Sequence, residues 1–319
     1  MEALGALAEW LKPGKRDRVN GHVRTIDTST RDAAGYRRVL AAQLPGLAQE
    51  GPSDLRTAAR KLAAQEGITL DTAAALHTAL DAAAPAEERA QCLQALARER
   101  HPELTKVLES CLASPSPRLR AAARDEFLKL DAAAGLASLA KVLEQGDLVE
   151  QQAAVAALGR LSATESDALL AALVARLEQG SLPAGLQLDL VEAVQARHLS
   201  ALQTRVDAWI ATQPSADATA AFATALEGGD AERGREIVNY HSAAACLRCH
   251  VVAGTGGHAA PSLEGVATRH DRRGLLQSLV EPNAVVAQGF GPVSAMPAMD
   301  KLLTPREIRD VVAYLSTLR

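Results

Sequence analysis

The pentapeptide Cys246-Leu247-Arg248-Cys249-His250 places two thiols and an imidazole at the spacing C-x-x-C-H. This spacing is the attachment signature of a c-type haem. The two thiols can form thioethers with the two vinyl groups of one porphyrin, and the histidine after them stands where a proximal iron ligand is needed. The motif therefore predicts one covalent haem c, attached through Cys246 and Cys249 and ligated by His250.

Two other uses of paired cysteines fit the sequence less well. A zinc site needs two further ligands, and the remaining cysteines, Cys92 and Cys111, lie far upstream in helical patterns. His241 and His258 flank the pentapeptide, so a Cys/His zinc site stays open as an alternative. A thioredoxin-like dithiol needs a βαβ setting, and no strand pattern lies nearby.

Helix signals surround the pentapeptide. Asp230 is the expected N-cap of a helix that runs into the motif. A Gly-rich loop from Gly254 to Gly257 follows the motif. A second helix is expected around Arg273–Val280, and Pro282 should end it.

The last residues of the chain combine a thioether-bearing loop with a capped helix. Residues 294–299 read Ser-Ala-Met-Pro-Ala-Met. Thr304 is the expected N-cap of the final helix, Pro305 its first residue, and Glu307 the partner that completes a capping box.

In this order, residues 229–319 resemble a class I cytochrome c. That family has a helix leading into C-x-x-C-H, a Gly/Pro loop, a middle helix, a Met-Pro loop and a terminal helix with an aromatic residue. The resemblance implies that Cys246 and Cys249 form the thioethers and that His250 is the proximal ligand. It also implies that the carbonyl of Pro261 accepts a hydrogen bond from His250 Nδ1–H, which orients the ring and raises its basicity.

The same resemblance implies a methionine sulfur as the distal ligand of the iron. Met296 is favoured because proline follows it, as is common in the family, and Met299 is the rival. Both could instead fill gaps in a core, although the chain has only 3 Met and two of them fall in this loop. His/Met ligation raises the reduction potential and leaves no open coordination position, which suits electron transfer.

Two further expectations concern the surroundings of the haem. Arg269, Arg272 and Arg273 could pair with the haem propionates, form a docking patch, or only belong to a solvated helix end. The terminal helix should cross the first helix of the domain and bring Tyr314 near Gly234.

Residues 31–226 differ from the haem segment in composition: they are rich in Ala and Leu and free of strand patterns. Similar helices recur at offsets of roughly 31 to 35 residues, with two helices in each unit. These segments resemble HEAT repeats, although Ala-rich helices can also form a bundle. The sequence predicts an all-α chain: an extended basic arm over residues 1–30, a HEAT-like α-solenoid over 31–226 and a class I cytochrome c fold over 229–319.

The predicted repeats carry no catalytic constellation, so a carrier is favoured over an enzyme.

Cys92 and Cys111 lie at matching levels of two helices expected at about 86–99 and 103–113. They could form a disulfide in an oxidising compartment or remain two buried thiols.

The order of arm, repeats and haem domain also resembles the C-terminal part of large bacterial membrane-bound dehydrogenases. In those proteins a β-propeller similar to PQQ-dependent sugar dehydrogenases comes first, and none is present here. This resemblance is carried by the repeats and by the segments Trp10–Arg18, Ser278–Asn283, 294–297 and Arg306–Leu315. It implies redox partners: a dehydrogenase module as donor, and a cytochrome or an oxidase as acceptor.

A c-type haem is attached outside the bacterial cytoplasm, so the expected location is periplasmic or otherwise extracytoplasmic. The sequence has no transmembrane stretch, and Ala3–Leu11 is too short for a signal peptide. We therefore expect the export signal to lie outside this chain. The 34 Lys and Arg against 38 Asp and Glu give no basic excess for nucleic-acid binding.

The main hypothesis is an electron-transfer protein that carries one haem c on a helical scaffold. One alternative is a haem sensor or a peroxidase-like enzyme with an open distal position. Another is a structural protein in which the helical repeats do the work.

Overall fold

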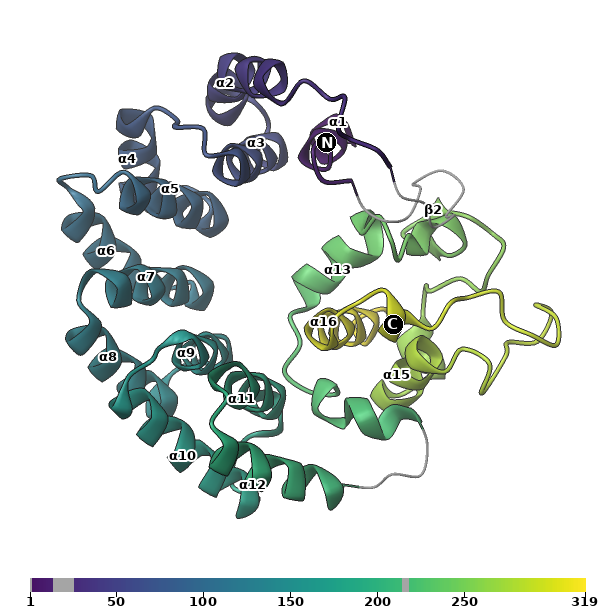
Figure 1. Cartoon of the computed structure of the whole chain (residues 1–319). Helices are drawn as coiled ribbons and strands as arrows, with labels where there is room; N and C mark the ends of the chain where they lie inside the picture. Colours follow the sequence, from purple (N-terminus) through teal and green to yellow (C-terminus); the bar gives the residue numbers. More distant parts are fainter. Residues whose placement is uncertain (1, 14–25, 214–217) are drawn as a thin grey trace. The chain divides into compact units, whose positions relative to one another are not determined.

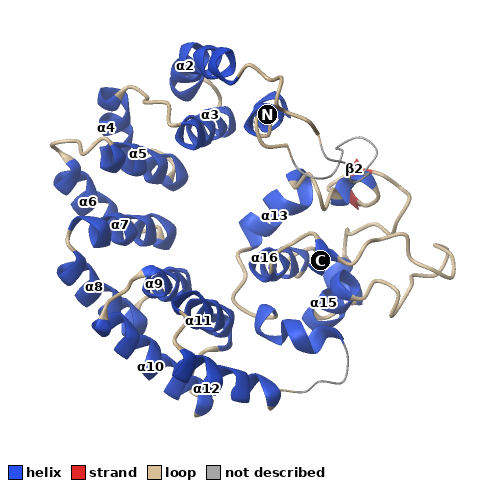
Figure 2. Ribbon diagram, viewed as in Figure 1, coloured by secondary structure: helices blue, strands red, loops and turns tan. Residues whose placement is uncertain are grey.

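The computed structural model describes residues 2–13, 26–213 and 218–319 (Figure 1). Nearly all of their regular structure is helical (Figure 2). The described residues form two compact units that divide between Ala154 and Val155. The domain boundary expected at residues 226–229 falls inside the second unit and stays a prediction. None of the described helices combines the length and the apolar character that a membrane span requires.

The N-terminal segment differs from the extended arm expected over residues 1–30. Helix α1 (Glu2–Ala8) lies within it. Leu4 is buried in a cluster with Leu40 and Leu44, and the hydroxyl of Tyr36 donates to the carbonyl of Leu7 over 2.6 Å. A helix this short owes its stability to tertiary packing rather than to its own sequence. The basic residues 14–25, which motivated the prediction of an arm, lie outside the described residues.

Short helices fill the first unit, in the order α2 (Ala33–Glu50), α3 (Ser53–Glu66), α4 (Thr72–Leu80), α5 (Ala86–Arg98), α6 (Leu104–Leu112), α7 (Pro117–Leu130) and α8 (Ala132–Gln145). Helix α9 (Leu148–Arg160) crosses the division. Glycine ends several of these helices; for example, Gly67 closes α3 in the left-handed conformation, with φ 66°. Helix α2 packs on α3, α4 on α5 and α6 on α7, while α3, α5 and α7 lie side by side (Figure 1).

A buried carboxylate between two arginines occurs twice in this unit. Glu88 on α5 accepts hydrogen bonds from Arg56 at 2.6 Å and Arg60 at 2.7 Å on α3. Glu150 on α9 pairs in the same way with Arg120 and Arg124 on α7. Each carboxylate is removed from water and is compensated by two guanidinium groups, as a buried charge requires.

Cys92 and Cys111 are free thiols, each buried in an apolar cluster with Leu93, Leu96 and Val107. Of the two alternatives drawn from the sequence, the structure therefore has the buried thiols and not the disulfide. Burial raises the pKa of both thiols, because the thiolate loses its hydration. They pack as small apolar side chains.

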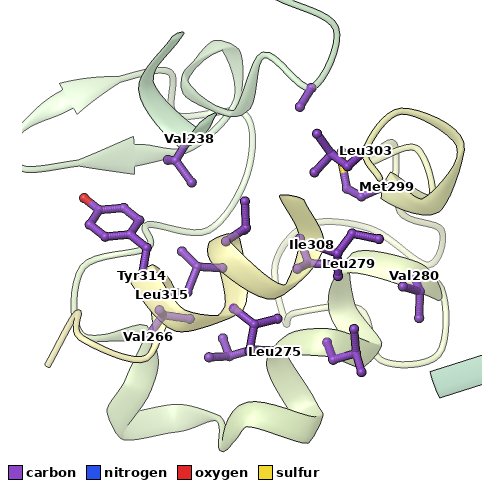
Figure 3. Close-up of a cluster of buried hydrophobic side chains, with 14 of the residues drawn as sticks. Val238, Val266, Leu275, Leu279, Val280, Met299, Leu303, Ile308, Tyr314 and Leu315 are labelled. Atoms are coloured by element: carbon purple, nitrogen blue, oxygen red, sulfur yellow. The ribbon is translucent and has the colours of Figure 1, made fainter. Parts of the chain in front are cut away.

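The second unit continues with α10 (Thr164–Glu178), α11 (Ala184–Arg197), α12 (Ser200–Ala211), η1 (Ala218–Ala225), α13 (Ala231–Tyr240), η2 (Cys246–Arg248), β1 (Val251–Val252), β2 (Thr255–Gly256), α14 (Val266–Arg269), α15 (Arg272–Val280), η3 (Met299–Lys301) and α16 (Pro305–Leu315). Leu275, Leu279, Ile308 and Leu315 lie together in the core of the part after residue 230 (Figure 3).

The helix ends expected from the sequence are confirmed. The carboxylate of Asp230 accepts from two backbone amides at the start of α13. Thr304 and Glu307 form the capping box of α16. Helix α15 begins one residue earlier than expected, because Asp271 rather than a later residue caps it.

The expected crossing of the first and last helices of the domain is also confirmed. A Cβ atom at Gly234 on α13 would collide with the carbonyl of Asp310 and the Cβ of Tyr314 on α16. Val238 and Tyr314 face the same region in Figure 3. The missing side chain at residue 234 is thus what lets the two helices touch.

A short β-hairpin departs from the all-α prediction. Val251 and Val252 pair antiparallel with Gly256 and Thr255. The two-residue loop between them, Ala253 and Gly254, has φ angles of 50° and 72°. Positive φ at both central positions is the geometry of a tight hairpin turn, which matches the twist of the two strands. Alanine at the first position hides this signal in the sequence.

Candidate functional site

The pentapeptide is folded into a single tight turn after α13. Ala245 takes a left-handed conformation with φ 44°, and the chain then enters η2. The amides of Cys249 and His250 both donate to the carbonyl of Cys246, over 3.2 and 3.0 Å. The turn therefore holds Cys246, Cys249 and His250 within one compact loop, as attachment to a single porphyrin would require.

His250 has a defined orientation. Its Nδ1 lies 2.7 Å from the carbonyl oxygen of Pro261. A carbonyl only accepts hydrogen bonds, so Nδ1 is the protonated nitrogen and Nε2 keeps its lone pair for a metal. The contact therefore sets the tautomer that an axial iron ligand needs.

Backbone hydrogen bonds fasten the segment before and after Pro261 to the pentapeptide. The amide of Ala260 donates to Cys249 over 3.0 Å, and the amide of Leu263 donates to Val251 over 3.0 Å. Gly257 packs so closely on Arg248 that an added Cβ would collide with its carbonyl. The position of Pro261 relative to His250 is thus fixed by the backbone on both sides.

Arg269 adds a clamp on the same segment. Its Nη2 donates to the carbonyl of Ser262 over 2.7 Å, and its Nη1 donates to the carbonyl of Glu264 over 2.9 Å. No side-chain pattern in the sequence indicates this role of Arg269, because the acceptors are backbone carbonyls. Arg272 is engaged elsewhere, with the carbonyl of Leu226 at 2.8 Å and the carboxylate of Glu227 at 3.1 Å.

The two methionines of the Met-Pro loop lie in different surroundings. Met299 is only 3% exposed and sits in the core beside Leu303 (Figure 3). Met296 is half-buried at the edge of that core, and its amide donates to the hydroxyl of Ser294 over 3.2 Å. Met299 thus has a packing role, whereas the Met296 side chain is not enclosed by the protein.

Apolar side chains surround the attachment turn. Cys246, Leu247 and Leu263 pack against the core as half-buried residues. Burial raises the pKa of the Cys246 thiol to about 11. An apolar wall beside the thiols suits the largely apolar porphyrin. The described residues contain no group of three or more His, Cys, Asp or Glu side chains that could hold a metal ion, which is what the zinc alternative requires.

The comparison with protein families gives the assignment. Residues 231–319 match the family model of cytochrome c. This part of the chain is a cytochrome c domain, and its cofactor is a covalently attached haem c with iron. The match does not reach the helices before residue 231. No curated protein and no solved structure matched the chain.

The residues present fit this cofactor. The two cysteines of the C-x-x-C-H turn are free thiols, the His250 ring is held with Nε2 unencumbered, and the surrounding wall is apolar. A cytochrome c domain with these features has a haem-binding, electron-transfer role.

Proposed function

We propose that this chain is a one-electron carrier whose haem c is attached at Cys246 and Cys249 and ligated by His250 and Met296. The observation that carries the proposal is the 2.7 Å contact between His250 Nδ1 and Pro261 O. Haem c supplies a one-electron iron couple. His250 provides Nε2 in a fixed orientation, and Pro261 makes that nitrogen a stronger donor by accepting the proton on the other side of the ring.

Met296 is the proposed distal ligand, with Met299 as the rival. Met299 is enclosed in the core, so ligation by its sulfur would require the core around Leu303 to open. Met296 needs no such change, because it lies half-buried at the core edge. A Met296 thioether bound to the iron would leave no open coordination position for an exogenous ligand.

For the haem propionates, we propose Arg273, an exposed arginine in the first turn of α15, as the cationic partner. Arg269 contributes differently, because its two terminal nitrogens hold the carbonyls of Ser262 and Glu264. It supports the cofactor site through the loop that carries Pro261.

We propose that residues 31–226 form HEAT-like repeats that act as a scaffold. The paired packing of α2 with α3 and α4 with α5 supports this proposal. So does the recurrence of the buried ion pairs, which join residues 32 apart at Arg56–Glu88 and 30 apart at Arg120–Glu150. Equivalent positions one repeat apart would give such a spacing.

On this proposal the chain accepts electrons from a dehydrogenase module and passes them to another cytochrome or to a terminal oxidase. The proposed location is periplasmic or otherwise extracytoplasmic, since cytochrome c domains are commonly found there. The donor and acceptor would dock briefly, through small interfaces.

Spectroscopy of the full chain tests the carrier proposal. The pyridine derivative of the reduced haem should show thioether attachment, and the oxidised protein should show the weak far-red band of sulfur-to-iron charge transfer. The reduced protein should not bind CO, because both axial positions are filled. A protein without the far-red band that binds CO would instead be a sensor or a peroxidase-like enzyme.

A further inference from the structure

The terminal helix of the cytochrome c domain hides charged side chains that a surface helix would expose. On α16, Arg309 is 5% and Asp310 is 7% exposed. The polar face of a helix at the surface of a domain normally meets water. Charged groups buried this deeply need partners within the protein.

The two buried charges on α16 have partners in two different parts of the chain. Asp310 faces α13, where it accepts the backbone amide of Asp230 over 2.8 Å. Arg309 faces α11, where its Nη1 lies 2.6 Å from Asp189 Oδ2. Helix α16 is therefore held between a helix of the cytochrome c domain and a helix that precedes it.

A second arginine of α16 extends this contact. Arg306 Nη2 lies 3.0 Å from Asp189 Oδ1, and Arg306 Nε contacts the carboxylate of Glu192. The cluster contains two guanidinium groups and two carboxylates, so its charges balance. Asp189 is fully buried, and α16 supplies both of the ion pairs that compensate it.

Helix α11 is anchored on its other side by the helices before it. Gly159 of α9 packs directly on Ala193, where an added Cβ would collide with the α11 backbone. Leu186, Leu190 and Val194 are also completely buried. The helix is thus shared between the helical segment and the cytochrome c domain.

We infer that α11 is a structural part of the haem domain and that Asp189 and Glu192 form the acceptor site for its terminal helix. The folding unit that holds the haem then begins before residue 231, where the family match starts. Asp189 binds α16 through Arg309. Helix α16 in turn packs on α13 at Gly234, and α13 leads into the Cys246 turn. The inference rests on the cytochrome c domain and its haem, and it holds whether or not the chain relays electrons from a dehydrogenase.

Equilibrium urea unfolding of the full-length haem protein tests this, with the Soret band reporting the haem site and far-UV ellipticity the helices. In Asp189→Asn, Arg306 and Arg309 lose a buried counter-charge. We expect the folded-to-unfolded ratio reported by the Soret band to fall about 100-fold or more. Glu178→Gln is the matched control, because Glu178 pairs with Arg205 at an exposed site of the same unit, and it should leave the Soret midpoint unchanged.

The double variant Asp189→Leu with Arg309→Leu separates a charge requirement from a packing requirement. Removing both charges leaves no uncompensated group, while Arg306 keeps Glu192, so the Soret midpoint should recover toward that of the wild-type protein. Recovery also supports the inference if Asp189→Asn alone fails to fold. A Soret midpoint in Asp189→Asn equal to that of Glu178→Gln would overturn the inference, and so would a double variant no better than Asp189→Asn. Absence of the haem from the wild-type protein would instead count against the proposed function.

Discussion

The imidazole Nδ1 of His250 and the carbonyl oxygen of Pro261 lie 2.7 Å apart, across a separation of 11 residues. The contact joins the residue that ends the C-x-x-C-H turn to a loop with no regular secondary structure. It leaves one ring nitrogen free and fixes the direction in which that nitrogen points. The electronic properties of the cofactor site therefore depend on how firmly the loop is held.

Loss of the Arg269 clamp should loosen this loop. In Arg269→Gln two charge-assisted hydrogen bonds to backbone carbonyls are lost, and because the side chain is exposed we expect a cost of about 1 kcal/mol. The midpoint potential of the haem should also move, because the His250–Pro261 contact weakens. Potentiometric titration of Arg269→Gln beside Arg235→Gln, an exposed change on α13, measures this; equal potentials in the two variants would contradict the clamp.

The α13–α16 crossing should be intolerant of a single methyl group. Gly234→Ala places a Cβ against the backbone of Asp310, and we expect a loss of about 3 kcal/mol in the stability of the haem domain. Gly46→Ala is the matched control, because Gly46 lies within α2 with open space around its Cβ position. That change should be neutral or slightly stabilising. Urea unfolding followed at the Soret band checks Gly234→Ala, and far-UV ellipticity checks Gly46→Ala. A tolerated alanine at residue 234 would mean that the helices do not touch there.

The stability of the first unit should depend on pH through Glu88. Burial opposes ionisation of this carboxyl, but hydrogen bonds from Arg56, Ser53 and Arg60 prevail and lower its pKa from 4.5 to about 2. A lowered folded-state pKa stabilises the protein above the unfolded value, and this stabilisation is lost as the pH falls from 4.5 toward 2. By pH 3 the loss from Glu88 should be roughly 2 kcal/mol.

Glu88→Gln isolates that contribution from the other carboxyl groups. Its far-UV unfolding midpoint in urea should start lower than that of the wild-type protein and fall less between pH 5.5 and pH 3. Parallel losses in the two proteins would show that Glu88 is not the group that titrates.

Local signals predicted much of the cytochrome c domain. The Asp230 cap and the Thr304–Glu307 capping box depend on residues within a few positions of one another. Such short-range patterns can be recognised from the sequence alone. Several helices of the first unit likewise end at a glycine, as at Gly51, Gly67 and Gly146.

Features that depend on distant residues could not be predicted in this way. The Asp189–Arg309 pair joins residues 120 apart, and neither residue is unusual in its own helix. The hairpin depends on Ala253 in a left-handed conformation, which alanine seldom adopts, so the residue type does not signal the turn. Helix α1 is stabilised by packing of Leu4 and Leu7 in an apolar cluster. A helix of so few turns is too short to be predicted from its own sequence.

The far-red sulfur-to-iron band of the oxidised protein tests the central claim most directly, because it reports the distal ligand on which the carrier proposal depends. We predict that the wild-type protein shows the band, that Met296→Ala lacks it and binds CO when reduced, and that Met299→Ala keeps it. Met299→Ala should instead lose stability, by about 2–5 kcal/mol, because it opens a cavity in the core. A wild-type protein without the band, or a band that survives in Met296→Ala and disappears in Met299→Ala, would contradict the ligand set proposed here.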